Sequence, residues 1–172
     1  LNMQRQGRIG SYLQVKGQEA SQVGSVYALK DSDWLFPMYR SSGALIARKQ
    51  PIYRMFLYWG GDERGLISPP KVNNFPIAIP VGTQTAHAAG AGWAARLLNE
   101  KTVSLVFMGD GATSKSEFHT GLNFAGVFHA NTVFVCENNQ FAISTPRDHQ
   151  SNAETIAQKA IAYGIKGIQI DG

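Results

Sequence analysis

The chain has 172 residues, of which 44% are hydrophobic and 16% charged, the composition of a soluble globular domain that needs no disulfide or structural metal. The net charge of +4 is mild and the basic residues are scattered, which argues against a nucleic-acid-binding protein. A single cysteine excludes a disulfide framework and fits a reducing compartment. No signal peptide or membrane span is visible, so we expect no membrane partner.

Glycine and proline divide the first hundred residues into helical segments and one long loop. Helical spacing predicts helices over residues 17–29, 41–50 and 52–59, the last two separated by Pro51. A proline-rich loop follows over residues 60–80, and a loop of that length is more often functional than idle. Residues 82–100 are rich in alanine and glycine, which predicts a buried helix lying close to a neighbouring backbone.

The second half alternates short apolar strands with helices. We expect a regular order of strands over residues 103–108, 132–137 and 167–170 and helices over residues 116–129 and 153–164. This alternation predicts an α/β fold with a parallel sheet covered by helices on both faces. Ligands of such sheets bind at the carboxyl ends of the strands, so the loops after residues 108 and 137 are candidate binding segments.

The first of these loops contains the sequence Gly109-Asp110-Gly111, which has two possible interpretations. A dinucleotide-binding turn of a hydride-transfer enzyme would have this glycine spacing and an acidic residue further along, such as Glu137. Against that interpretation, Ser114 replaces the third glycine, and the Asp110 carboxylate would repel a pyrophosphate. A bound cation would remove the repulsion.

A magnesium site explains the aspartate better. Mg²⁺ prefers oxygen ligands and commonly bridges one or two protein groups to phosphate oxygens. Asp110 would be the charged ligand, and Asn138 and Asn139 follow the next strand, where one amide could face the metal and the other brace the turn. Gly-Asp-Gly alone is equally typical of a simple turn. Its place at one strand end, with Asn-Asn at the next, favours the metal site.

The pairing of Gly-Asp-Gly with Asn-Asn resembles the shared motif of thiamine diphosphate-dependent enzymes. Longer segments resemble the E1 alpha subunit of 2-oxo acid dehydrogenase complexes, particularly the branched-chain type of bacteria, over nearly all 172 residues. They include "MYRSSGALIARKQ", "FPIAIPVGTQTAHAAGAGWAARL", "GDGATSKSEFHTGLNFAGVF" and "ENNQFAISTPRDHQ". The resemblance implies thiamine diphosphate and Mg²⁺ as cofactors, with K⁺ possible.

The resemblance also assigns residues to the cofactor, and none of those in this chain would be catalytic. Mg²⁺ would be held by Asp110, Asn139 and the backbone carbonyl of Phe141. The other implied contacts are Tyr39 and Arg40 to the diphosphate, Gly111 and Ala112 through their backbone N–H groups, Ile79 and Val81 to the aminopyrimidine and the bent cofactor, and Thr83 and Gln84 to potassium.

Two departures from the family pattern are visible. Glu137 stands where some relatives have an arginine that touches phosphate, so we expect it to turn away or to serve the structure. The family's phosphate-contacting histidine and the last strand of its cofactor domain would lie beyond Gly172. We therefore expect residues 1–172 to be one thiamine diphosphate-binding domain, C-terminally incomplete and part of a longer subunit.

The activity that the resemblance implies is oxidative decarboxylation of branched-chain 2-oxo acids with acyl transfer to lipoamide. The implied partners are an E1 beta subunit and a lipoyl-bearing E2 protein, in the bacterial cytoplasm or, in a eukaryote, the mitochondrial matrix. Two alternatives remain open. One is a truncated or engineered module that is inactive by itself and retained for structure or self-association as a homo-oligomer. The other is the hydride-transfer enzyme, which preferential binding of NAD would favour.

Overall fold

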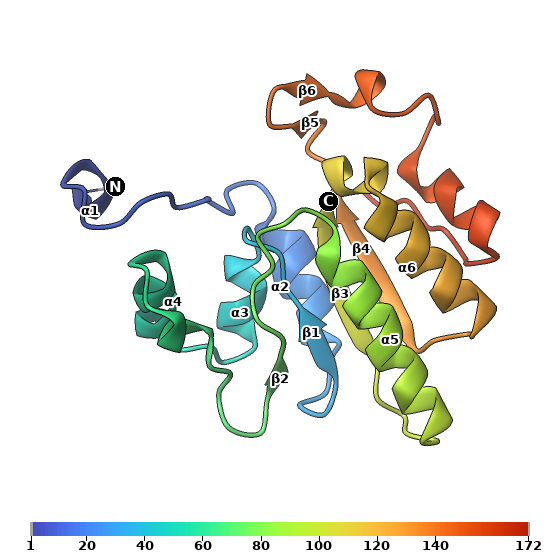
Figure 1. The fold of residues 1–172 in the computed structure, drawn as a ribbon, viewed down its shortest axis with the longest axis horizontal. Coiled ribbons are helices and arrows are strands. Elements are labelled where there is room, and N and C mark those ends of the chain that lie inside the picture. Colours follow the sequence, from blue (N-terminus) through green and yellow to red (C-terminus); the bar gives the residue numbers. More distant parts are fainter. Residues whose placement is uncertain (1, 172) are drawn as a thin grey trace.

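A computed structural model describes residues 2–171, and its centre is a parallel sheet of four strands in the order β2-β1-β3-β4 (Figure 1). All three neighbouring pairs of strands run parallel. The strands predicted over residues 103–108 and 132–137 are confirmed as β3 and β4. The strands are β1 (Trp34–Phe36), β2 (Asn73–Asn74), β3 (Ser104–Gly109) and β4 (Thr132–Glu137).

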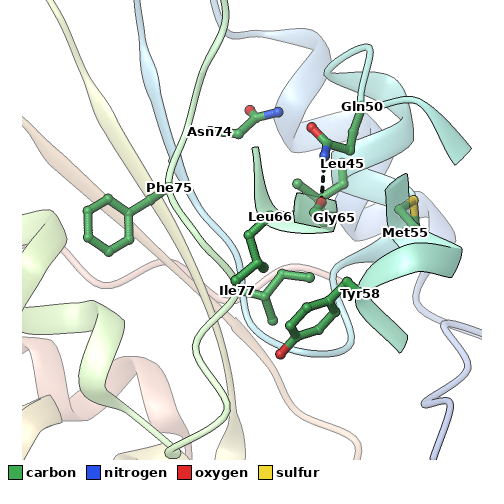
Figure 2. Close-up of a pocket in the computed structure, with 9 residues that line it drawn as sticks. All are labelled: Leu45, Gln50, Met55, Tyr58, Gly65, Leu66, Asn74, Phe75 and Ile77. Atoms are coloured by element: carbon green, nitrogen blue, oxygen red, sulfur yellow. Dashed lines mark hydrogen bonds between the residues drawn. The ribbon is translucent and has the colours of Figure 1, made fainter. Parts of the chain in front are cut away.

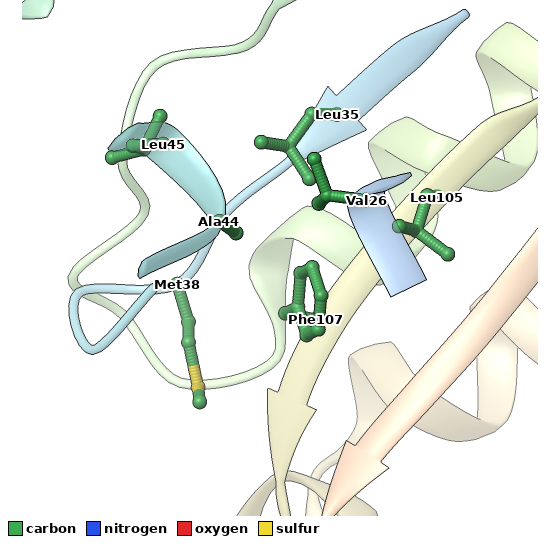
Figure 3. Close-up of a cluster of buried hydrophobic side chains, with 7 residues drawn as sticks. All are labelled: Val26, Leu35, Met38, Ala44, Leu45, Leu105 and Phe107. Atoms are coloured by element: carbon green, nitrogen blue, oxygen red, sulfur yellow. The ribbon is translucent and has the colours of Figure 1, made fainter. Parts of the chain in front are cut away.

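Helices cover both faces of this sheet, as predicted. Successive side chains of β3 point to opposite faces, so Leu105 and Phe107 pack with α2 and α3 (Figure 3), whereas Val106 packs with α5. Met108, on the same face as Val106, packs with α6. Figure 1 shows α5 and α6 on the near side of the sheet and α2 on the far side. These helices are α2 (Glu19–Tyr27), α3 (Ser42–Ala47), α5 (Thr83–Leu97) and α6 (Ser116–Val127).

The small residues of α5 permit the close backbone approach that the sequence predicted. A Cβ atom added at Gly92 would lie 2.2 Å from Oγ1 of Thr132 and 2.9 Å from the backbone of Asn131. A Cβ atom at Gly121 of α6 would lie 3.0 Å from the backbone of Thr85. Glycine at these two positions therefore sets the distances from α5 to β4 and from α5 to α6.

A short helix, α4 (Ile52–Trp59), and a 3-10 turn, Glu63–Leu66, lie beside α3 and enclose a small cavity (Figure 2). Gln50 closes one side by donating hydrogen bonds to the carbonyls of Gly65 and Ile67, at 3.3 and 3.2 Å. Its free amide oxygen and the amide nitrogen of Asn74 point toward one another, and neither has a partner among the described residues.

The chain beyond β4 differs from the prediction. A hairpin of β5 (Phe141–Ala142) and β6 (Thr145–Pro146) and a 3-10 turn, Arg147–His149, lie in the expected loop. The predicted helix over residues 153–164 is instead a 3-10 segment, Ile156–Tyr163. At the N-terminus lies α1 (Asn2–Arg5).

The predicted strand over residues 167–170 is wrong for this structure. A strand needs a hydrogen-bonded neighbour, and this segment instead lies against the 3-10 segment, where a Cβ atom at Gly167 would be 2.2 Å from the carbonyl oxygen of Ala157. Its apolar side chains, Ile168 and Ile170, stay exposed. Within residues 2–171, no helix has the length and apolar character needed to cross a membrane.

Candidate functional site

The residues assigned to the cofactor all follow the carboxyl ends of the four parallel strands. Gly109 and Glu137 are register partners on β3 and β4, so Asp110 and Asn138 leave the sheet at the same edge. A parallel bridge between Met38 and Ala78 extends the pairing of β1 and β2 in the same direction. Around this edge lie Tyr39 and Arg40 after β1, Ile79 and Val81 after β2, Asp110, Gly111 and Ala112 after β3, and Asn139 and Phe141 after β4.

Asp110 is a buried carboxylate that forms no ion pair with a basic side chain of residues 2–171. Its side chain is 2% exposed at the start of the 3-10 turn Asp110–Ser114, and Oδ2 accepts a hydrogen bond from Nε2 of Gln150 at 3.2 Å. The two ion pairs among the described residues, Lys49–Asp31 and Arg64–Asp62, do not include it. Because burying an unpaired charge is costly, this carboxylate fits a cation ligand.

The other expected magnesium ligands contribute neutral oxygens. Oδ1 of Asn138 accepts from the N–H of Gln140 at 3.3 Å, and Oδ1 of Asn139 accepts from the N–H of Phe141 at 3.1 Å. Both amides stabilise the turn, so the structure does not show the expected arrangement in which one amide faces the metal and only the other stabilises the turn. An amide oxygen has two lone pairs, so each can still bind a cation. Residues 2–171 contain no group of three or more His, Cys, Asp or Glu side chains placed to hold a metal ion.

The β5–β6 hairpin packs directly on the Gly-Asp-Gly turn. A Cβ atom added at Gly111 would lie 2.7 Å from Cβ of Ala142, so only glycine allows this approach. Gln150, just after the hairpin, donates to Asp110 and also to the carbonyl of Thr145, at 3.0 Å. Sequence reasoning missed Gln150 because it lies 40 residues from Asp110.

Tyr39 and Arg40 occupy a tight turn that follows β1. The turn is closed by a hydrogen bond from the N–H of Ser41 to the carbonyl of Met38, at 3.0 Å, and by Oγ of Ser41, which accepts from the N–H of Met38 at 3.1 Å. Nη1 of Arg40 donates to the carbonyl of Gln14 at 2.8 Å. Within residues 2–171 this is the hydrogen bond that the guanidinium makes, so its other N–H groups can donate to an anion.

Glu137 turns away from the site, as expected. Its carboxylate accepts hydrogen bonds from Ser21 and, at 3.2 Å, from Nε2 of Gln22, both on α2. Burial raises the pKa of Glu137, and these hydrogen bonds and the charge of Arg40 oppose that shift. Glu137 therefore anchors the end of β4 to α2.

The segment before α5 contains the residues expected to bind potassium. Gly82 begins this helix with a left-handed φ of 90°. The amide of Gln84 is buried and donates to the carbonyl of Phe107 at 2.8 Å, and its Oε1 has no partner among the described residues. A buried carbonyl oxygen without a donor fits a monovalent cation.

Comparisons with known proteins decide the family. A model of the family described as "Dehydrogenase E1 component" matches residues 1–172. The chain belongs to the dehydrogenase E1 component family. Among its relatives, the 3-methyl-2-oxobutanoate dehydrogenase subunit alpha of Mycobacterium tuberculosis (strain CDC 1551 / Oshkosh) is 45% identical over the whole chain, which covers 47% of that protein. The pyruvate dehydrogenase E1 component subunit alpha of Acholeplasma laidlawii is 46% identical over the whole chain, which covers 50% of it.

This E1 chain thus spans about half the length of the curated relatives it matches. Among solved structures, a Mycobacterium smegmatis protein described as a thiamin diphosphate-dependent enzyme aligns with 86% of this chain and 25% of its own, at a TM-score of 0.54 and 16% identity. That likeness supports the α/β fold. The family assignment comes from the sequence comparisons.

Proposed function

We propose that this E1 chain binds the diphosphate and the Mg²⁺ of thiamine diphosphate in an enzyme that oxidatively decarboxylates 2-oxo acids and transfers the acyl group to lipoamide. The observation that carries the proposal is the buried Asp110 carboxylate, which has no ion pair within the described part of the chain and lies where the four parallel strands end. When bound, thiamine diphosphate supplies the nucleophilic carbon and the electron sink that decarboxylation of a 2-oxo acid requires.

The residues of this chain would bind and orient the cofactor. Asp110, the Asn139 amide and the Phe141 carbonyl would offer Mg²⁺ three oxygens, and phosphate oxygens would complete its coordination. Tyr39 and Arg40 would donate to the diphosphate from the neighbouring strand end. The diphosphate residues follow β1 and the Asn139 and Phe141 ligands follow β4, and these are the two neighbours of β3, which precedes Asp110. This arrangement supports the assignment of the two sets of residues to diphosphate and metal.

The remaining assigned groups would position the rest of the cofactor. The N–H groups of Gly111 and Ala112, at the start of the turn after β3, would reach phosphate oxygens. The side chains of Ile79 and Val81 are 49% and 40% exposed, and such apolar groups at a strand-end site suit contact with an organic ring. A potassium ion bound by Gln84 and Thr83 would stabilise the turn that carries Val81.

The partners and the substrate belong to the same proposal. We infer an E1 beta subunit and a lipoyl-bearing E2 protein as partners, and the bacterial relatives make the cytoplasm the expected compartment. A branched-chain 2-oxo acid is the proposed substrate, supported by the name of the Mycobacterium tuberculosis relative. Pyruvate is the alternative, because a pyruvate dehydrogenase subunit is equally similar.

The test is titration calorimetry with thiamine diphosphate, with and without Mg²⁺, on the full-length protein co-expressed with its beta subunit. We expect binding that requires Mg²⁺ and that is lost on Asp110→Ala. Asp148→Ala, which removes an exposed carboxylate near the same site, is the matched control and is expected to bind as the wild type does.

Three results would contradict the proposal or part of it. A folded wild-type protein that does not bind thiamine diphosphate would favour the module without activity of its own. Preferential binding of NAD would favour the hydride-transfer interpretation of the Gly-Asp-Gly turn. Undiminished binding by Asp110→Ala would remove the metal-ligand assignment.

A further inference from the structure

One buried amide joins three segments that border the proposed diphosphate site. The side chain of Gln22, on α2, has no exposed surface. Its Nε2 donates to the carbonyl of Arg40 at 3.1 Å and to Oε2 of Glu137 at 3.2 Å. Its Oε1 accepts from the N–H groups of Gly43 and Ala44, at 3.0 and 3.4 Å.

These contacts use the complete hydrogen-bonding capacity of the amide. A glutamine side chain has two donor hydrogens and two acceptor lone pairs, and Gln22 engages all four in the protein interior. The opposite orientation of the amide would place its oxygen against two acceptors and its nitrogen against two donors, so the surroundings fix a single orientation. A polar group satisfied in this way specifies its neighbours' positions.

The neighbours that Gln22 holds lie on both sides of the site. Arg40 follows β1, and Gly43 and Ala44 form the first turn of α3, directly after the Tyr39–Arg40 turn. Glu137 ends β4, two residues before Asn139. The amide therefore ties the turn that carries the proposed diphosphate arginine to the strand that carries the proposed magnesium ligand.

No other buried glutamine of residues 2–171 makes this link. Gln50 is also buried, but it lies between α3 and α4 and donates to the carbonyls of Gly65 and Ile67, not to the Arg40 turn or to Glu137. Gln84 donates to a carbonyl within β3. Gln22 is thus the side chain whose contacts reach both the Arg40 turn and the end of β4.

We propose that Gln22 is a positioning residue for the diphosphate site and acts through Arg40, by holding the Arg40 turn at a fixed place relative to the end of β4. The inference rests on the proposed binding of thiamine diphosphate. It assigns Gln22 no contact with the cofactor.

The experiment is a double-mutant cycle on thiamine diphosphate affinity in the full-length protein with its beta subunit, measured by titration calorimetry in Mg²⁺. Gln22→Met keeps the approximate volume and removes all four hydrogen bonds, and it is expected to raise Kd about 10-fold, as loss of an orienting contact typically does. In an Arg40→Ala background the same change is expected to raise Kd less than about 3-fold, because the group it positions is gone. Gln50→Met is the matched control, with an expected change in Kd of less than about 2-fold.

A second variant keeps the inference testable if Gln22→Met does not fold. Gln22→Glu keeps an acceptor for Gly43 and Ala44 but leaves at most one donor proton, shared with the adjacent Glu137 carboxyl group, and it is expected to weaken binding in the same direction at a temperature where circular dichroism shows native structure. Wild-type affinity in both Gln22 variants, or a Gln22 effect of equal size with and without Arg40, overturns the inference alone. Absence of binding by the wild-type protein overturns the proposed function, and this inference with it.

Discussion

The amide of Gln150 lies 3.2 Å from the carboxylate of Asp110, although 40 residues separate them in the chain. Metal-binding carboxylates are oriented by such outer hydrogen bonds, and losing one typically costs about 10- to 100-fold in metal affinity. We expect Gln150→Leu to weaken Mg²⁺-dependent binding of thiamine diphosphate about 10-fold in calorimetric titration. Gln158→Leu, at an exposed glutamine of the same region, should leave affinity unchanged. Equal affinities in the two variants would show that Gln150 does not orient Asp110.

Gly92 and Gly90 provide a matched pair on α5. Gly92→Ala places a methyl group 2.2 Å from Oγ1 of Thr132, and such overpacking is expected to lower the free energy of unfolding by about 1–3 kcal/mol. A Cβ atom at Gly90 has no neighbour within 4 Å. Gly90→Ala should therefore be neutral or add up to about 1 kcal/mol through helix propensity. Urea unfolding measures both, and a neutral Gly92→Ala would contradict the packing described for α5.

Arg48 is a buried guanidinium held by backbone carbonyls. Nη1 donates to Lys30 and Nη2 to Asp33, each at 2.6 Å, and burial lowers the pKa of the guanidinium. Lysine cannot reproduce this fork, so Arg48→Lys is expected to cost about 2–3 kcal/mol in urea unfolding. Lys49→Met removes only an exposed pair with Asp31 and should cost at most about 0.5 kcal/mol. Similar losses in both variants would contradict the structural role of Arg48.

The thiol of Cys136 should be unreactive in the folded protein. Burial, and then the charges of Asp110 and Glu137, raise its pKa from 9.0 to about 12. Because the thiolate is the reactive form, we expect alkylation by iodoacetamide at pH 8.5 to be at least about 10-fold slower in native protein than in urea. Equal rates would show that the thiol is accessible and ionised.

The same shift predicts a pH effect on stability. A raised pKa in the folded state means that the unfolded chain ionises first, so the stabilising contribution of Cys136 is complete below pH 9 and is lost as pH rises toward 12. Relative to Cys136→Ala, the wild-type protein should lose free energy of unfolding across that range. Parallel pH profiles for the two proteins would contradict the raised pKa.

The sequence predicts the second half of the sheet better than the first. β3 and β4 are apolar runs of six residues joined by a glycine turn and a helix, so their local pattern is sufficient. β1 and β2 are only three and two residues long, and their extended form depends on pairing with β3 and with each other. Segments that short contain no alternation to recognise.

The residues of the candidate site likewise differ in how well the sequence predicts them. Asp110 is recognisable because it directly follows β3, and the Asn138-Asn139 pair because it follows β4, whereas the resemblance to a known family supplied Tyr39 and Arg40. Gln22 and Gln150 were missed, because a single glutamine in a helix or loop carries no local pattern. Gln22 meets Glu137 across 115 residues, and only the folded chain reveals such a contact.

The strand order β2-β1-β3-β4 brings together the ends of four chain segments that are far apart in sequence, and the proposed cofactor site uses residues from all four. A ligand that contacts all four segments links the strands to one another, because its full binding site exists only when every strand has paired in the sheet. By mass action it then stabilises the assembled sheet over any partly folded form. Binding of the cofactor would thus depend on complete folding of this part of the protein.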